Sequence, residues 1–451
     1  MDLLDPLFGS EEVNSVFSDR SGLQGMLDFE AVLAAVEGRV GVIPESAVAP
    51  ITAKCGADLF DLSALAEASV QAGNLAIPMV KQLTALVGKD DAQAMRYVHW
   101  GATSQDAIDT GLVLQLRAAL TLIRADLGRL CDVLENLAEA HRATPVAART
   151  WMQHAVPTTF GLKAAGALDA LTRHRARLRE TARRVLVVQF GGAAGTLAAL
   201  GARGLDVAKA LAEELRLELP TLPWHAHRDR VAEVATTLAL LTGTLGKIAR
   251  DLSLQMQTEV GEVFEPSGEG RGGSSTMPHK RNPVTSAVVL AAANRVPALT
   301  SIMLSAMSQE HERGLGGWQA EWQTLPEIVR LSAGALHHVV NTMAGLEIDP
   351  RRMRANLELT RGLIFAEAVA AALAKHTGNA AAHQVLESAS RKAAAENRHL
   401  RDVLAAEPEV TRYLDSAQLD QWFDPLAYTG AAGQFIDRVV AASRADSEEG
   451  E

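Results

Sequence analysis

The segment 266–283, PSGEGRGGSSTMPHKRNP, has the clearest potential for chemistry in this sequence. Four glycines, at 268, 270, 272 and 273, precede two serines, and Lys280 and Arg281 follow before Pro283. Glycines let backbone N–H groups approach an anion closely, and a helix beginning after Pro283 would add the positive end of its dipole. This composition is typical of a flexible anion-binding loop that carries hydroxyl groups. By composition alone, a solvated surface loop is the alternative.

The run 268–273 also matches the G-x-G-x-x-G spacing of dinucleotide-binding loops. That fingerprint requires a preceding strand within a βαβ unit. A long helical pattern precedes the run here, so we do not expect a dinucleotide site. Lys280 is not preceded directly by glycine, so the sequence does not match a Walker phosphate-binding loop either.

Two long segments with helical periodicity must position this loop. Seven apolar residues recur between 116 and 137, and seven more between 231 and 252, at alternating spacings of three and four. The first pattern predicts a helix capped by Asp109 or Thr110 that ends near Pro145, and the second a helix over about 229–261. A helix of about 30 residues is about 45 Å long, and its apolar seam needs partner helices.

Further helices are predicted over 157–188, after Pro283 with a kink at Pro297, and from Pro326 onward. The sequence therefore predicts an all-α fold with three helical domains and a long central helix bundle. We expect an N-terminal helical domain over 1–109, the central bundle over 110–347 and a C-terminal helical domain over 348–451. The long seams favour self-association, with an intramolecular coiled coil in a monomer as the alternative.

Composition limits the class of protein. The 451 residues are 48% hydrophobic and 22% charged, as in ordinary globular proteins. The net charge of −11 argues against a general nucleic-acid or anionic-membrane binder. Two cysteines, Cys55 and Cys131, exclude a disulfide scaffold and fit a reducing cytoplasm. We expect no membrane span, secretory signal, metal or other cofactor.

Three blocks of sequence together resemble the signatures of the fumarase/aspartase superfamily. Residues 273–283, GSSTMPHKRNP, resemble G-S-S-x-M-P-x-K-x-N-P; residues 99–106, HWGATSQD, resemble H-x-G-x-T-S-x-D; and residues 149–157, RTWMQHAVP, resemble R-T-H-x-Q-x-A-x-P. The blocks occur in the family's order, and the resemblance covers nearly the whole chain. It implies an all-α homotetramer in which each active site is built from three subunits, one block from each.

One departure from the family pattern indicates the reaction. Trp151 stands where the adenylosuccinate and argininosuccinate lyases of this superfamily carry the His that protonates a leaving nitrogen. An indole is not a useful acid at neutral pH, so the leaving group should need no proton. A carboxylate is such a group, because its acid has a pKa of about 4. Opening of a lactone expels a carboxylate, and the reverse is a cycloisomerisation; His154 acting as the acid is the alternative.

A second departure lies in the segment 310–322, EHERGLGGWQAEW. Arg313 matches an arginine of adenylosuccinate lyase, but Gly316 and Trp322 stand where that enzyme has a Ser and an Arg that hold the nucleotide phosphate. Because Trp322 cannot make the bidentate contact that an Arg makes with a phosphate, a purine nucleotide substrate is not expected. Further runs, at 17–34, 96–117, 189–201 and 257–267, resemble bacterial cycloisomerases of the superfamily, which close an unsaturated tricarboxylate to a lactone in aromatic catabolism. The alternatives are adenylosuccinate lyase or another superfamily lyase, and a non-catalytic scaffold, which the presence of Ser274 and Lys280 argues against.

The resemblance also implies roles for single residues. Ser274 would donate the proton to carbon, tuned by Lys280 and the loop amides, and Lys280 with Asn282 would hold the carboxylate that becomes an enediolate. His154 would orient the substrate or donate a proton. Other substrate contacts are expected from Arg20, His99, Thr103, Ser104, Trp151, Gln153, Ser275, Met277 and Arg313. As alternatives, His99 could be a core histidine, Arg20 could pair with Asp19 or Glu30, and Trp151 could serve packing alone.

Overall fold

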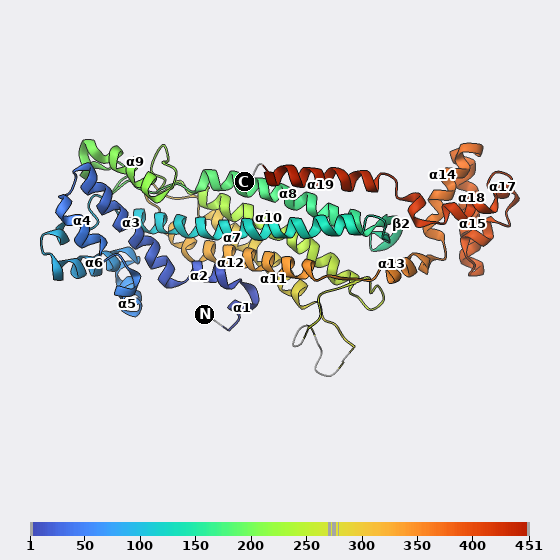
Figure 1. The fold of residues 1–451 in the computed structure, drawn as a ribbon, viewed down its shortest axis with the longest axis horizontal. Coiled ribbons are helices and arrows are strands. Elements are labelled where there is room, and N and C mark those ends of the chain that lie inside the picture. Colours follow the sequence, from blue (N-terminus) through green and yellow to red (C-terminus); the bar gives the residue numbers. More distant parts are fainter. Residues whose placement is uncertain (1–2, 269–271, 273–276, 278, 449–451) are drawn as a thin grey trace. The chain divides into compact units, whose positions relative to one another are not determined.

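The computed structural model describes residues 3–268, 272, 277 and 279–448. Its regular structure is almost entirely helical, which confirms the predicted all-α class (Figure 1). The described strands form two short antiparallel pairs, β1 (Pro145–Thr150) with β2 (Gln153–Thr159) and β3 (Val263–Phe264) with β4 (Glu347–Ile348). The chain divides into two compact units: unit 1 comprises Met1–Asp126, His174–Gly246 and Val288–His338, and unit 2 comprises Leu127–Arg173, Lys247–Ala287 and Val339–Glu451. The division into domains over 1–109, 110–347 and 348–451 stays a prediction.

Unit 1 holds the N-terminal helices, drawn in blue in Figure 1. The helix α3 packs on α4 and α9. Ser18 caps the start of α3 by accepting from the backbone N–H of Ser21, and Gly41 ends it in the left-handed conformation. The helices of this unit are α1 (Asp5–Phe8), α2 (Glu11–Val16), α3 (Asp19–Val40), α4 (Glu45–Thr52), α5 (Leu62–Ala72), α6 (Ala76–Asp90) and α9 (Gly204–Leu215), with 3-10 turns at Ala57–Leu59, Ala94–Tyr97 and Ala198–Arg203.

Unit 2 holds the C-terminal helices. A core of small and branched apolar residues, including Val369, Leu386 and Leu404, packs α14 against α15 and α16. The helices are α13 (Pro350–Leu357), α14 (Ala366–Thr377), α15 (Asn379–Glu396), α16 (Leu400–Leu404), α17 (Pro408–Thr411), α18 (Ser416–Trp422) and α19 (Ala432–Glu448), with 3-10 turns at Glu358–Thr360, Leu363–Phe365 and Pro425–Tyr428.

Long helices contribute residues to both units: α7 (Ser104–Ala140), α8 (Phe160–Val185), α10 (Asp229–Gln255), α11 (Val284–Ser305) and α12 (Gly317–Ala344). The predicted seams are present, but some predicted ends are wrong. The helix α7 begins before Asp109 and Thr110, so neither caps it. Instead, the Thr110 hydroxyl donates to the carbonyl of Gln189. The helix α12 begins at Gly317, so Pro326 lies inside it, as Pro297 lies inside α11.

A buried charge network joins three of these helices within unit 1. Arg228, directly before α10, donates two hydrogen bonds to Asp109 of α7, at 2.7 and 3.1 Å, and reaches Glu321 of α12 at 2.6 Å. Trp318 Nε1 donates to the same Asp109 carboxylate at 3.0 Å. All three charged side chains are about 1% exposed. Burial disfavours the Arg228 charge, yet Asp109 and Glu321 outweigh it and raise the pKa of the guanidinium.

Two described helices, α10 and α11, are long and apolar enough to cross a membrane by length and composition. The apolar stretch of α10 is 61% buried inside the protein, as in the core helix of a globular fold. That of α11 is only 28% buried. We therefore interpret α10 as a core helix, and α11 as a helix whose apolar surface is left uncovered in a single chain.

The buried network generates a stability prediction. Arg228→Met leaves Asp109 and Glu321 as buried carboxylates without a counter-charge, and removing one partner of such a pair costs about 3–5 kcal/mol. Urea unfolding, followed by circular dichroism at one fixed protein concentration, should show a large fall in midpoint. The matched control is Arg173→Met, which removes an exposed ion pair with Asp169 on α8 and should cost at most about 1 kcal/mol. Equal, small shifts in both variants would contradict the prediction.

Candidate active site

The first predicted block precedes the long helix α7 within unit 1. His99 and Gly101 both adopt left-handed backbone conformations, with φ of 58° and 68°. Positive φ is uncommon for a non-glycine residue and is found preferentially at functional sites. The chain then enters α7 at Ser104, and the acidic Asp106 lies in the first turn of the helix. Thr103 and Ser104 thus place two hydroxyl groups at the start of α7.

Asp106 organises the surroundings of this helix start. Its carboxylate is fully buried and accepts hydrogen bonds from the backbone N–H groups of Thr103 at 3.0 Å, Gly191 at 3.1 Å and Gly192 at 2.9 Å. It also accepts from Gln189 Nε2 at 3.3 Å, and it lies 2.7 Å from His225 Nε2. The block at 99–106 is therefore tied to the glycine-containing run at 189–201.

Arg313, predicted to bind a substrate carboxylate, lies beside Thr103. Its guanidinium donates to the Thr103 hydroxyl at 3.0 Å and to the backbone carbonyls of Ala193 at 3.0 Å and Gly192 at 3.4 Å. Its buried Nε has no hydrogen-bond partner among the described residues. Unit 1 therefore brings together a fixed guanidinium and a hydroxyl, which is a suitable arrangement for a carboxylate.

His99 forms an imidazole–carboxylate pair in the same region. Its Nδ1 lies 2.6 Å from the buried Glu30 carboxylate of α3. Burial alone would lower the pKa of His99, but Glu30 and, more weakly, Asp106 outweigh burial and raise the pKa above its usual value. His99 is thus a paired, largely buried histidine, and its proposed contact with substrate is a separate prediction.

Arg20 makes a different contact from either alternative considered in the sequence. It pairs with Asp58 on the surface of unit 1, and not with Asp19 or Glu30. Both side chains of the pair are more than half exposed, so the pair holds Arg20 weakly. Substrate binding by Arg20 stays a prediction.

The second block forms a β-hairpin in unit 2, which the helical periodicity did not predict. Trp151 and Met152 form its two-residue turn, both with positive φ, of 52° and 65°. Such a turn normally takes Asn or Gly, because the left-handed region is costly for other residues. The Trp151 side chain is 97% exposed and that of Met152 is 71% exposed. The hairpin therefore presents an apolar tip to solvent, with Gln153 directly after it.

An ion pair supports the base of this hairpin. Arg149 donates two hydrogen bonds to the buried Glu262, at 2.7 and 2.9 Å, and Asn356 donates to the same carboxylate at 2.8 Å. His154 has a buried Nδ1 with no described partner, and burial together with Arg149 lowers its pKa. A neutral imidazole does not favour His154 as the acid at neutral pH. Burial also lowers the pKa of the nearby Lys163.

The third block is only partly described. Ser274 and Ser275 lie outside the described residues. Met277 and Lys280 are exposed, and the backbone N–H of Asn282 donates to the Gly272 carbonyl at 2.9 Å. Arg281 forms a two-pronged pair with Glu347, at 2.7 and 2.8 Å, which lowers the pKa of that carboxyl to about 2. Arg281 therefore serves the scaffold, and Lys280 stays available to an anion.

The expectation that the helix after Pro283 offers its dipole to this loop is wrong. The buried Glu265 carboxylate accepts from the backbone N–H groups of Thr285 at 2.9 Å and Ser286 at 2.7 Å. The start of α11 is thereby occupied by a carboxylate of the protein itself.

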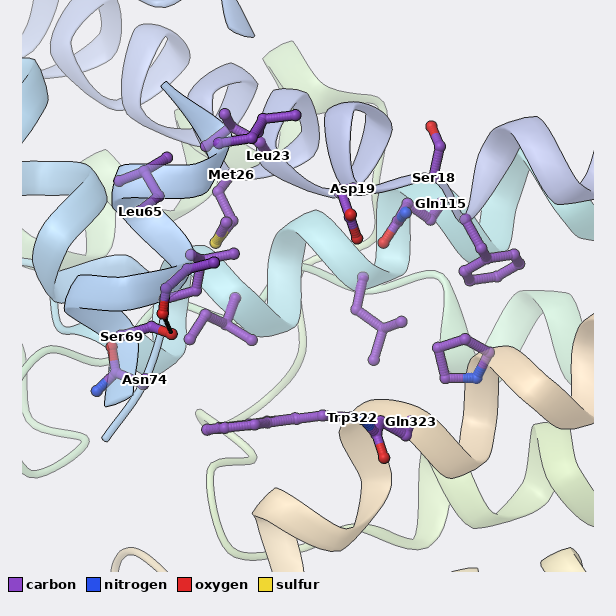
Figure 2. Close-up of a pocket in the computed structure, with 18 of the residues that line it drawn as sticks. Ser18, Asp19, Leu23, Met26, Leu65, Ser69, Asn74, Gln115, Trp322 and Gln323 are labelled. Carbon is purple, nitrogen blue, oxygen red and sulfur yellow. Dashed lines mark hydrogen bonds between the residues drawn. The ribbon is translucent and has the colours of Figure 1, made fainter. Parts of the chain in front are cut away.

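A cavity of about 820 Å³ lies elsewhere in unit 1, between α3, α5, α7 and α12 (Figure 2). Trp322 lies along one wall, and its buried Nε1 has no described hydrogen-bond partner. Arg330 is the one cation among the described lining residues, against Asp19 and Glu327. None of the predicted site residues lines this cavity, and its acidic and apolar walls do not suit a tricarboxylate.

Two residues with evident roles were not singled out from the sequence: Glu30 and Glu262. Glu30 carried a readable signal, because it lies on the apolar stripe of α3 with Met26 and Leu33, where a charge requires a partner. Glu262 gave none, since its partners, Arg149 and Asn356, are distant in sequence. Among the described residues, no group of three or more His, Cys, Asp or Glu side chains could hold a metal ion.

Comparisons with known proteins place the chain among lyases. Residues 9–298 match the family described as lyase, and residues 362–439 match the adenylosuccinate lyase C-terminus. The 3-carboxy-cis,cis-muconate cycloisomerase of Pseudomonas aeruginosa is 58% identical, covering 98% of this chain and 96% of the relative. That of Bradyrhizobium diazoefficiens is 54% identical, covering 98% of each. The crystal structure of 3-carboxy-cis,cis-muconate lactonizing enzyme from Pseudomonas putida matches with a TM-score of 0.95 and 53% identity over 99% of both chains.

The site geometry generates a second stability prediction. Asp106→Asn turns an amide N–H₂ toward donors that need an acceptor, so the protein should lose on the order of 2–4 kcal/mol, since each hydrogen bond to a charged group contributes about 1.5–3 kcal/mol. Thermal unfolding should show a lower midpoint than wild type. Asp132→Asn, an exposed position on the same helix, is the control and should change stability by less than about 0.5 kcal/mol. An Asp106→Asn protein as stable as the control would show that the hydrogen bonds do not organise this region.

Proposed function

The chain belongs to the lyase family, and within it we propose that this protein interconverts 3-carboxy-cis,cis-muconate and 4-carboxymuconolactone as a cycloisomerase. The observation that carries the proposal is its identity with named cycloisomerases over nearly the full chain. The reaction belongs to protocatechuate breakdown in the β-ketoadipate pathway. It is favoured over adenylosuccinate lyase, because Gly316 and Trp322 replace the residues expected to hold a nucleotide phosphate.

The chemistry requires a site that neutralises a tricarboxylate. One carboxylate oxygen adds to a conjugated alkene carbon, and negative charge develops beside a second carboxylate as an enediolate. A proton then adds to carbon, so closure of the trianion takes up one proton and gives a dianionic lactone. Fixed positive groups that face the developing charge lower this barrier. Among the described residues, the Arg313 guanidinium and the Lys280 ammonium are suited to this role.

Within this proposal, Ser274 delivers the proton to carbon, and Lys280 and Asn282 bind the carboxylate that becomes the enediolate. Thr103, Ser104, Gln153 and Arg313 bind the other carboxylates, with His99, Arg20, Ser275 and Met277 completing the contacts. Trp151 supplies an apolar wall. The hydrogen bond from Arg313 to Thr103, and the exposure of Lys280, support this assignment.

The proposal includes a homotetramer whose active sites each take one block from three subunits. Two features support it. The apolar stretch of α11 is mostly uncovered in a single chain, and the hairpin tip exposes Trp151 almost fully. Exposed apolar surface of this kind marks an interface. A cytoplasmic location is also proposed, which the two buried cysteine thiols, Cys55 and Cys131, support.

The proposed activity predicts a fall in ultraviolet absorbance when the purified protein meets 3-carboxy-cis,cis-muconate in the presence of a chelator. Closure removes the conjugated diene, so a rapid enzyme-dependent fall is expected. The chelator tests whether a removable metal is needed. A folded protein that leaves the absorbance unchanged, but releases fumarate from adenylosuccinate, would replace the proposed function by the alternative.

The proton assignment predicts that Ser274→Ala abolishes turnover with little change in folding. The substitution removes one hydroxyl and no charge, so the melting temperature should stay close to wild type. The same assay measures turnover, and Ser267→Ala, at the foot of the loop, is the matched control. A Ser274→Ala enzyme that kept most of its kcat would show that another group delivers the proton.

Sharing of sites between subunits predicts recovery of activity in mixed tetramers. Thr103→Val and Ser274→Ala lie in different blocks and should each inactivate the enzyme. When the two variants are unfolded, mixed in equal amounts and refolded together, random assembly leaves about a quarter of the sites with both blocks intact. Activity near that fraction of refolded wild type is expected. A mixture as inactive as its components would mean that one chain supplies the whole site.

A further inference from the structure

Glu30 and His99 form a closely paired acid and base that the catalytic assignment does not explain. Glu30 lies in the middle of α3, and its side chain is 1% exposed. The His99 side chain is 16% exposed, and its Nδ1 lies 2.6 Å from a Glu30 carboxylate oxygen. Among the described residues, His99 is the hydrogen-bonding partner of this buried carboxylate. A carboxylate at this depth without a partner would cost several kcal/mol, so the pair is mutually dependent.

The contact fixes which nitrogen of the imidazole is left for a ligand. Because Nδ1–H donates its hydrogen bond to Glu30, Nε2 is the nitrogen that can face another group. No described residue pairs with Nε2. The backbone of His99 is left-handed, a costly conformation that is found preferentially at functional sites. A histidine that served only as packing would not need this conformation.

Negative charge surrounds the imidazole from more than one element. Glu30 comes from α3 and Asp106 from α7, and both favour the protonated ring. Glu37, two turns further along the same face of α3, is buried, and neither of its carboxylate oxygens has a hydrogen-bond partner among the described residues. Burial, aided by Glu30, raises its pKa to about 9, so it is neutral at pH 7. Burial and the same carboxylate raise the pKa of the neighbouring Cys55 thiol to about 12, so it too is neutral.

We propose that Glu30 is a positioning residue that holds His99 as an imidazolium, with its Nε2–H available to a carboxylate of the substrate. The inference rests on the proposed function. Arg313, which binds Thr103 in the same region, and His99 would then provide two cationic donors of different kinds. The guanidinium is charged at any working pH, whereas the imidazolium is charged only while Glu30 sustains it.

The sign of the pH dependence follows from this pairing. A raised pKa means that His99 is charged below that pKa, and its contribution to substrate binding is lost as pH rises through it. Without the Glu30 charge, burial lowers the pKa of His99, so its contribution to substrate binding is lost at a lower pH. A neighbouring opposite charge shifts a pKa by about 1–3 units, which sets the expected displacement. The substrate carboxyls titrate near pH 4, well below this range.

The test is the pH profile of kcat/KM for 3-carboxy-cis,cis-muconate, measured for wild type, Glu30→Gln, Glu30→Asp and Glu37→Gln. Glutamine still accepts a hydrogen bond from Nδ1 but carries no charge. We expect the alkaline limb of Glu30→Gln to move down by about 1–3 pH units, with kcat/KM near wild type at the acidic end. Glu30→Asp keeps a carboxylate, so its alkaline limb should lie closer to the wild-type pH than that of Glu30→Gln. Glu37→Gln replaces a neutral carboxyl by a neutral amide, so its profile should match wild type below about pH 8.

Each outcome decides between a positioning and a merely structural role. A uniform fall in kcat/KM at all pH values, or an unchanged profile, would overturn the inference. If Glu30→Gln does not fold, His99→Gln provides the same decision, because the alkaline limb should be absent from its residual activity; a limb that persists would contradict the proposal. Wild-type turnover is measured first, so failure of the proposed function would show as an inactive wild type and not as an unshifted limb.

Discussion

The architecture of unit 1 depends on two buried aspartates one turn apart on α7, Asp106 and Asp109. Both side chains are fully buried, and a buried carboxylate is tolerated only when donors surround it. Asp106 gathers backbone N–H groups from the loop before α7 and from residues 191–192. Asp109 takes Arg228 and Trp318. The first two turns of α7 therefore hold Thr103 through Asp106 and the start of α12 through Asp109. The segment that carries Arg313 lies directly before α12.

The charges of this chain are divided between scaffold and site. Arg228, Arg149 and Arg281 each pair with carboxylates of the protein, namely Glu321, Glu262 and Glu347. Lys280 stays exposed, and Arg313 binds a hydroxyl and backbone carbonyls, none of which cancels its charge. Under the proposed function, Arg313 and Lys280 are the cations that would let a protein of net charge −11 bind a tricarboxylate.

Sequence periodicity predicted the helices well and their ends poorly, for identifiable reasons. The seams at 116–137 and 231–252 are one-dimensional patterns, and each lies within a single helix, α7 and α10. The start of α7 was misplaced because Asp109 resembles a capping residue, whereas its real partner, Arg228, lies more than a hundred positions away. The hairpin at 145–159 was missed because its turn is Trp-Met, which lacks the Asn or Gly that signals such a turn. The three motif blocks located most candidate residues, while Glu30 was missed although its place on an apolar stripe with Met26 and Leu33 could be read from the sequence.

The unusual turn at Trp151 is consistent with a reaction in which a carboxylate is the nucleophile. Left-handed backbone at two successive non-glycine residues costs on the order of 1–2 kcal/mol for each, and the exposed indole adds a further cost in a single chain. A histidine at this position would donate to the attacking carboxylate and weaken it as a nucleophile. An indole can pack against the substrate and exclude water without neutralising that oxygen. Exclusion of water strengthens the attraction of fixed cations for the developing enediolate. In the proposed cyclisation, the loss of an acid at the hairpin tip is therefore favourable, and the proton for carbon must come from a different block.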